Sequence, residues 1–149
     1  MQLSEKLISS FLAFELDTDI NSPIHGIRTN AIKKFEELGF PTRKLENWKY
    51  TSLNRIIKED YTVFSKKKNV LDFKNVKDYF IDNIESYKIV IVDGFFDPFL
   101  SQTSHDGLDI CIMSAALNKP KYSKIIKKYF NKTANSEDSL TSLNTAFSK

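Results

Sequence analysis

The sequence predicts an α+β fold, in which a mainly helical N-terminal portion packs on a small β-sheet and is followed by an amphipathic helix and a linker. Apolar residues recur every three or four positions through residues 3–38, which is the spacing of one helix face. Residues 88–93 are β-branched and almost wholly apolar, which favours a strand. Residues 122–131 place lysines and apolar side chains on opposite faces of a helix.

Two helices are predicted in the first forty residues. The first carries Leu3, Leu7, Ile8, Phe11 and Leu12 at helical spacing. The second is predicted to start at a Ser22 cap with Pro23 in its first turn, and to end at Gly39. Its apolar stripe consists of Ile24, Ile27, Ala31, Ile32, Phe35 and Leu38. Arg28 lies off this stripe and is expected in solvent.

The middle of the chain changes from helix to strand. Leu53, Ile56 and Ile57 predict a short helix that fades by Asp60, residues 66–69 form a polar break, and residues 75–84 have helical spacing. The strand at residues 88–93 is expected to be covered on both faces, because it lacks polar alternation.

A tight turn follows the first strand at Asp93 and Gly94, and residues 95–99 are expected to return as its partner until Pro98 interrupts them. Residues 108–113 are predicted as a second strand of the same small sheet. A short helix then opens at residues 114–117, before the amphipathic one.

Two parts are predicted along the chain, a domain over residues 1–131 and a linker with an unfinished segment over residues 132–149. At 149 residues the chain is long enough for one domain with a modest core. Residues 131–139 are rich in Ser, Asn and Thr, as linkers are. The last ten residues carry apolar groups that nothing evident in the chain covers.

The composition is that of an ordinary globular protein, with 41% hydrophobic and 28% charged residues. A formal charge of +3 does not by itself imply nucleic acid. The single cysteine, Cys111, excludes an intramolecular disulfide and fits a reducing compartment. No apolar run approaches the roughly 20 residues of a membrane-spanning helix. We therefore expect a cytoplasmic protein without a membrane partner.

The residue types that carry catalysis or bind metals are sparse. Cys111 with His105 is imaginable as a nucleophile and base, but Cys111 sits in an apolar strand, where a thiol is usually a small buried hydrophobe. His25 and His105 are the only histidines and are expected to be ordinary exposed ones, so no metal site is predicted. Phosphate-binding glycine motifs are absent. We expect neither an enzyme nor a cofactor held by this chain.

One basic segment supports an alternative function. Residues 119–132 contain six lysines and no acidic residue, namely Lys119, Lys121, Lys124, Lys127, Lys128 and Lys132. A small nucleic-acid-binding module could use such a face. An ordinary amphipathic helix is the favoured interpretation, because the segment lacks arginine and its aromatic residues lie on the opposite side.

The most informative segment is residues 40–51, which hold the only tryptophan among alternating charges. Pro41 restricts the backbone, and Thr42 is predicted to cap a short helix that carries Leu45 and Trp48. The segment could simply fix how one helix leaves another, or it could bind a partner protein, since Trp and Arg are favoured interface anchors. The candidate contact residues are Arg43, Lys44, Glu46, Trp48, Lys49 and Tyr50.

Three segments together resemble a known family. They are residues 39–53 around Gly-Phe-Pro-Thr-Arg-Lys and Trp-Lys-Tyr-Thr, residues 91–101 with the pattern V-x-G-x-F-x-P-x-L-S, and residues 139–147. In this order they resemble the N-terminal region of the SufD family of iron–sulfur cluster assembly proteins. The family's chain is much longer, so the resemblance implies an N-terminal domain without the family's β-helical core.

The resemblance also implies a function. Members of the SufD family are non-catalytic scaffold components that assemble with SufB-like proteins and SufC-like ATPases. An iron–sulfur cluster is implied for the full assembly complex and not for this chain. The residues 40–51 segment is then expected to serve partner contact or positioning.

Overall fold

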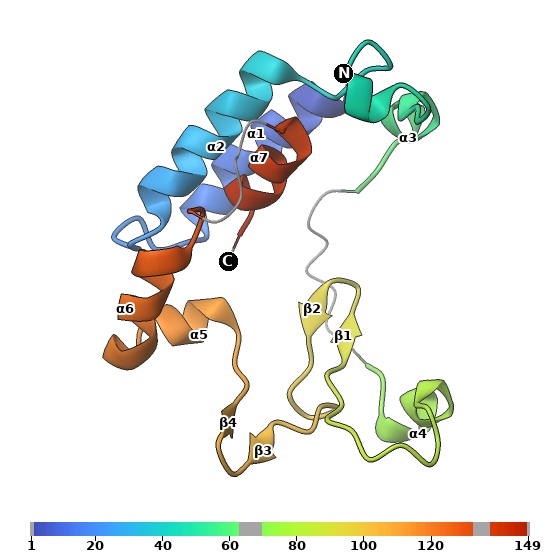
Figure 1. Cartoon of the computed structure of the whole chain (residues 1–149), viewed down its shortest axis with the longest axis vertical. Coiled ribbons are helices and arrows are strands. Elements are labelled where there is room, and N and C mark those ends of the chain that lie inside the picture. Colours follow the sequence, from blue (N-terminus) through green and yellow to red (C-terminus); the bar gives the residue numbers. More distant parts are fainter. Residues whose placement is uncertain (1, 63–69, 133–137, 149) are drawn as a thin grey trace. The chain divides into compact units, whose positions relative to one another are not determined.

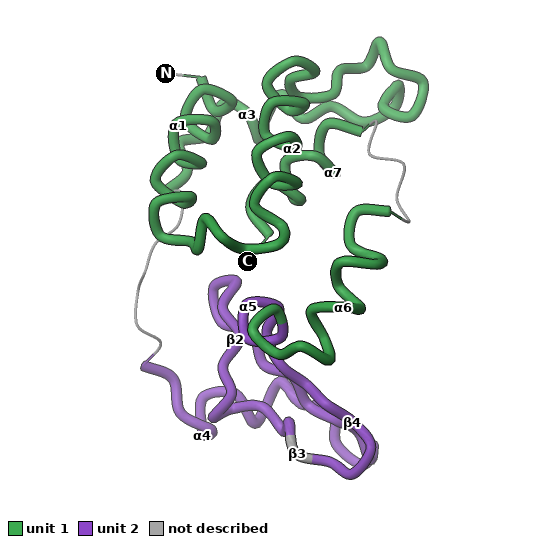
Figure 2. The backbone as a smooth tube through the Cα atoms, turned by 90° about the vertical axis from the view of Figure 1, so that its left-hand side faces the viewer, with its two compact units in different colours: residues 1–64, 117–149 green, residues 65–116 purple. Residues whose placement is uncertain are grey.

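The computed structural model describes residues 2–62, 70–132 and 138–148. The chain divides into two compact units, drawn in green and purple in Figure 2. We call residues 1–64 and 117–149 the helical unit and residues 65–116 the hairpin unit. The α+β fold class is confirmed, with helices in both units and short antiparallel strand pairs in the second.

The two N-terminal helices are confirmed as α1 (Leu3–Leu16) and α2 (His25–Leu38). The predicted start of α2 is wrong by two residues: Ile24 occupies the cap position, and the Ser22 carbonyl accepts a hydrogen bond from the His25 N–H at 3.0 Å. Pro23 therefore lies in the preceding turn. Gly39 ends α2 as predicted, with a φ of 64°.

The C-terminal segment forms a further helix of the same unit. Helix α7 (Ser139–Ala146) packs against α2, and helices α1, α2 and α7 lie side by side in Figure 1. Asp138 caps α7 by accepting a hydrogen bond from the Thr141 N–H at 2.8 Å. The expectation that nothing in the chain covers the last residues is therefore wrong.

Aromatic rings fill the core between these helices. The buried cluster comprises Phe11, Phe14, Ala31, Ile32, Phe35 and Ala146. Phe147 packs edge-to-face on Phe14, with ring centroids 5.3 Å apart, and Phe40 packs in the same way on Phe35 at 5.2 Å. The α7 end of the chain is thus part of the core. The predicted boundary between a domain over residues 1–131 and a linker segment over residues 132–149 stays a prediction.

A short helix, α3 (Asn54–Lys58), appears where the sequence predicts one. Just beyond it, the Asp60 carboxylate accepts a hydrogen bond from the Lys6 ammonium of α1 at 2.6 Å. This contact with Lys6 lowers the pKa of Asp60 from its ordinary value. Because Asp60 is exposed, the pair is a surface tie between the two segments and contributes little to stability.

The hairpin unit contains two separate strand pairs. Strands β1 (Ile91–Val92) and β2 (Phe95–Phe96) pair antiparallel around the predicted Asp93–Gly94 turn, where φ is 50° and 84°. Strands β3 (Ser104–His105) and β4 (Leu108–Asp109) form the other pair. The single sheet predicted from residues 88–93 and 108–113 is thus wrong, because each strand pairs with its nearest neighbour in sequence.

Two further expectations for this unit need correction. Ile89 and Ile91 are exposed, so the first strand is not covered on both faces. The helix predicted over residues 75–84 is shorter and begins earlier, as α4 (Phe73–Val76) followed by the 3₁₀ turn η2 (Lys77–Tyr79). Asp72 caps α4 through a hydrogen bond from the Asn75 N–H. The predicted polar break at residues 66–69 lies outside the described residues.

Two helices follow the hairpins. Helix α5 (Met113–Leu117) matches the short helix predicted there, and α6 (Pro120–Tyr129) confirms the amphipathic helix. Pro120 occupies the first turn of α6, where its missing N–H costs nothing. The predicted linker at residues 131–139 includes residues 133–137, which lie outside the described part of the chain.

Candidate partner-binding site

The segment of residues 40–51 is fixed at its N-terminal end by the core. Gly39 adopts φ 64° and ψ −168°, a combination that essentially only glycine reaches, and this turns the chain sharply out of α2. Phe40 then places its ring against Phe35, and Pro41 is buried. The candidate contact residues are therefore carried on a segment whose first residues are held by the helical unit.

The rest of the segment consists of consecutive tight turns. The N–H groups of Leu45, Trp48 and Thr51 donate to the carbonyls three residues earlier, at 3.0, 2.9 and 2.9 Å. Glu46–Trp48 is a single 3₁₀ turn, η1. The sequence predicted Thr42 as the N-cap of a short helix, and this is wrong. Its hydroxyl instead accepts a hydrogen bond from the Lys44 N–H at 3.4 Å, within a local turn.

Three of the predicted residues form a small exposed cluster. The Lys49 ammonium lies 3.8 Å from the Glu46 carboxylate and 5.6 Å from the centre of the Tyr50 ring. Tyr50 is 88% exposed. Glu46 and Lys49 are three residues apart in a tight turn, so their side chains emerge on the same side. This cluster presents a ring, a cation and an anion together.

The other three predicted residues surround that cluster in sequence. Arg43 and Lys44 are exposed, while Trp48 is half-buried. The intermediate burial of the indole therefore does not choose between a connecting role and a partner contact. The surface combines aromatic rings and an arginine, types enriched at protein interfaces, with lysines and a glutamate, types that are depleted there.

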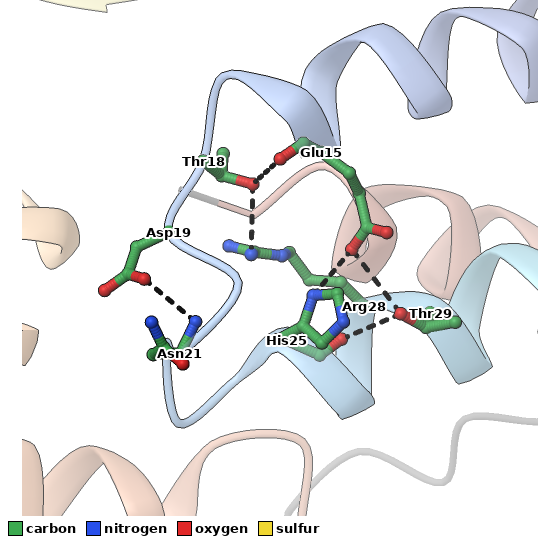
Figure 3. A network of polar contacts seen from close by, with 7 residues as sticks. All are labelled: Glu15, Thr18, Asp19, Asn21, His25, Arg28 and Thr29. Atoms are coloured by element: carbon green, nitrogen blue, oxygen red, sulfur yellow. Dashed lines mark hydrogen bonds and ion pairs between the residues drawn. The ribbon is translucent and has the colours of Figure 1, made fainter.

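A second polar group of residues joins α1 to α2, and Figure 3 shows it from close by. The Thr29 hydroxyl donates to the Glu15 carboxylate at 3.4 Å. His25 Nδ1 lies 2.9 Å from the same carboxylate, at ion-pair distance but outside hydrogen-bond geometry. His25 is thus half-buried against Glu15 and is not the freely exposed histidine expected from the sequence.

Arg28 is the main correction to the sequence analysis in this region. It is 2% exposed, whereas its place beside the apolar stripe predicted solvent. Its Nη2 donates to the Thr18 hydroxyl at 3.2 Å, and its guanidinium lies 5.8 Å from the Phe14 ring centre. Within the described residues it pairs with no carboxylate. The burial and the turn contact indicate a role in joining α1 to α2.

The remaining chemical candidates stay apart. Cys111 is exposed and precedes α5, so the prediction of a buried strand thiol is wrong. His105 packs its ring on Tyr87, with centroids 4.2 Å apart. No group of three or more metal-ligating side chains occurs in the part of the chain that the structure describes. Among the same residues, no helix is long and apolar enough to cross a membrane.

The fold is of the α+β class, and the candidate contact residues lie on a largely exposed turn segment. The model of the family described as the SufBD protein N-terminal region matches residues 2–149, so the chain belongs to the SufB/SufD family. Its members are components of iron–sulfur cluster assembly. No curated protein and no solved structure matched the chain.

Proposed function

We propose that this chain is the N-terminal part of a SufD-like scaffold component of iron–sulfur cluster assembly. It acts without catalysis, in the cytoplasm, by contacting SufB-like proteins and SufC-like ATPases. The observation that carries the proposal is the family match over residues 2–149, combined with the exposed cluster of Glu46, Lys49 and Tyr50.

The three segments that resemble SufD occupy distinct places in the structure. Residues 39–53 form the turn segment after α2, residues 91–101 include the β1–β2 hairpin, and residues 139–147 include α7. Only the last is buried in the helical core. The first supports a contact function because it carries the exposed cluster of Glu46, Lys49 and Tyr50, which core packing does not explain.

The iron–sulfur cluster is cargo in this proposal. The described residues offer no group of ligands that could hold it. Nucleotide hydrolysis belongs to the SufC-like partner, since the sequence has no phosphate-binding glycine loop. The contribution of this chain is contact and positioning through Arg43, Lys44, Glu46, Trp48, Lys49 and Tyr50.

Co-purification with SufB-like and SufC-like proteins from the same source tests the proposal. The test variant replaces Glu46, Lys49 and Tyr50 by alanine. A matched control replaces Lys77, Asp78 and Tyr79, which likewise occupy an exposed 3₁₀ turn, in the hairpin unit. We expect the test variant to lose at least about tenfold in capture, as for a small interface hot spot. Equal capture of both variants would contradict the assigned surface.

A further inference from the structure

Helix α6 separates its side chains into two faces. Tyr122, Ile125, Ile126 and Tyr129 follow the spacing i, i+3, i+4 and i+7, which places them in one stripe. Lys124 and Lys127 occupy the opposite side of the helix, and Lys121 and Lys128 flank the stripe. The separation is typical of a helix whose apolar stripe is covered by another surface.

The described part of the chain leaves that stripe incompletely covered. No residue of α6 is buried, and Ile125 and Tyr129 are 52% and 56% exposed. A ten-residue helix has little stability in water by itself, because nucleation is costly and few hydrogen bonds follow it. Packing of the stripe against a further surface would supply the missing stabilisation.

Lysines line the edges of the stripe. The Lys121 and Lys128 ammonium groups lie 5.0 Å from the ring centres of Tyr122 and Tyr129, and Lys119 lies 5.8 Å from Tyr122. No acidic residue occurs in residues 119–132. The surface that covers α6 must therefore accept apolar side chains at its centre and positive charge at its edges.

We propose that α6 is a docking helix that inserts its stripe into an apolar groove rimmed by carboxylates on a protein partner of the same assembly. The inference rests on the proposed function and names a second contact surface, separate from residues 40–51. Anchors at i, i+3, i+4 and i+7 are the pattern of a helix bound in a protein groove.

Nucleic acid and lipid fit the helix less well. A phosphate backbone would engage the lysines and leave Ile125 and Ile126 without a role. A membrane surface would accept both faces, but ten residues offer a small apolar area for that purpose, and stable anchoring usually requires a second signal. The sequence likewise predicts no membrane partner.

The apolar arm of the test uses Ile125→Ser with Tyr129→Ser in the 149-residue chain. Both side chains are largely exposed, so the chain should keep its fold, which circular dichroism checks. The matched control is Leu12→Ser with Leu16→Ser, two exposed leucines of α1. Capture of SufB-like and SufC-like proteins should fall at least about tenfold for the α6 variant and stay unchanged for the control.

The charge arm uses Lys121→Glu with Lys128→Glu, the two lysines whose ammonium groups lie 5.0 Å from the ring centres of the stripe tyrosines. The control, Lys33→Glu with Lys58→Glu, makes the same change of charge at exposed positions of α2 and α3. We expect the α6 charge variant to weaken capture about threefold to tenfold at low salt, with a smaller effect at about 0.5 M salt. In the complex, the α6 amides should exchange more slowly than in the free chain.

The outcomes separate this inference from the proposed function. If the wild-type chain captures a partner and the α6 variants capture it equally well, the docking helix is wrong and the proposed function stands. If the wild-type chain captures neither partner, both fail. Strong amide protection of α6 in the free chain would show that the chain itself covers the stripe. If the α6 variants lose the wild-type chain's binding to phosphatidylglycerol vesicles or duplex DNA but still capture the partner, α6 binds those surfaces instead.

Discussion

The helical unit and the hairpin unit differ in how they use their apolar residues. In the helical unit, aromatic side chains from α1 and α2 meet the end of α7, and Phe35 is 0% exposed. In the hairpin unit, the buried apolar side chains among the described residues are Val76, Leu100 and Ala116. Phe99, an equally large side chain in that unit, is 97% exposed.

This difference indicates where the stability of the chain resides. Burial of apolar surface is the main favourable contribution to folding, and it scales with the area removed from water. The helical unit buries whole phenylalanine rings, whereas the strands of the hairpin unit are two residues long and are joined by tight turns. We infer that the helices carry most of the unfolding free energy, and that the hairpins are held mainly by local hydrogen bonds.

The largest predicted effect is on the free energy of unfolding, when a phenylalanine is replaced by alanine in each of the two units. Phe35→Ala should lower the free energy of unfolding by about 3–5 kcal/mol, because it leaves a cavity in the core. Phe99→Ala should change it by less than about 0.5 kcal/mol, since its ring is in solvent. Urea denaturation followed by circular dichroism measures both. Similar losses for the two variants would remove the distinction between the units.

The next largest effect is expected when glycine is replaced by alanine at two positions with positive φ. Gly39→Ala should cost about 1–3 kcal/mol, because φ 64° with ψ −168° is strained for any residue with a Cβ atom, although no atom lies within 4 Å of that position. Gly94→Ala, in the β1–β2 turn, is the control: φ 84° is also unfavourable there, but we expect the loss to stay local to the hairpin. Equal shifts of the urea denaturation midpoint for the two variants would contradict the expectation that the loss at Gly94 stays local.

Trp48→Ala should have an intermediate effect. The indole is half-buried, so about 1–2 kcal/mol of stability should be lost, less than for Phe35. Tyr50→Ala, two residues on at an almost fully exposed position, serves as the control and should leave the melting temperature unchanged. A loss at Trp48 as large as at Phe35 would make the segment a buried seam and weaken its assignment to partner contact.

The smallest effect concerns the Lys6–Asp60 tie. Lys6 lowers the pKa of Asp60 in the folded chain, so the stabilisation is present above the ordinary carboxyl value of about 3.9 and is lost as the pH falls through the lowered pKa. Asp60→Asn should therefore reduce Tm slightly at pH 7, and the difference should shrink as the pH falls below the ordinary carboxyl value. Asp78→Asn in the hairpin unit controls for the loss of one surface charge. A difference that grows on acidification would contradict the pairing.

Helices α1, α2 and α6 were predictable because each carries a periodic apolar stripe. The stripe of α2 from Ile24 to Phe35 and its Gly39 ending are both local signals. The burial of Arg28 was not predictable in this way, because Thr18 and Phe14 cover it from a different helix and turn. Such contacts arise only when two segments pack together.

Helix α7 and the exposure of the first strand were missed for two other reasons. The buried face of α7 consists of Ser139, Ser142, Thr145 and Ala146, small residues that give almost no hydrophobic signal. The run of residues 88–93 gives a strong signal, but strand propensity largely reports packing on a neighbouring surface, and this strand remains exposed. The residue types of the candidate site indicated from the sequence that it could bind a partner. The contact of Lys49 with the Tyr50 ring depends on side-chain positions, which the sequence does not give.

Amide hydrogen exchange on the free 149-residue chain tests the contrast between the units most directly. We expect the interior amides of α1, α2 and α7 to exchange only through global unfolding. Those of the β1–β2 and β3–β4 pairs should exchange at least about a hundredfold faster, through local opening. Equal protection of the two units, or fast exchange in α7, would contradict the inference that the helices carry most of the unfolding free energy.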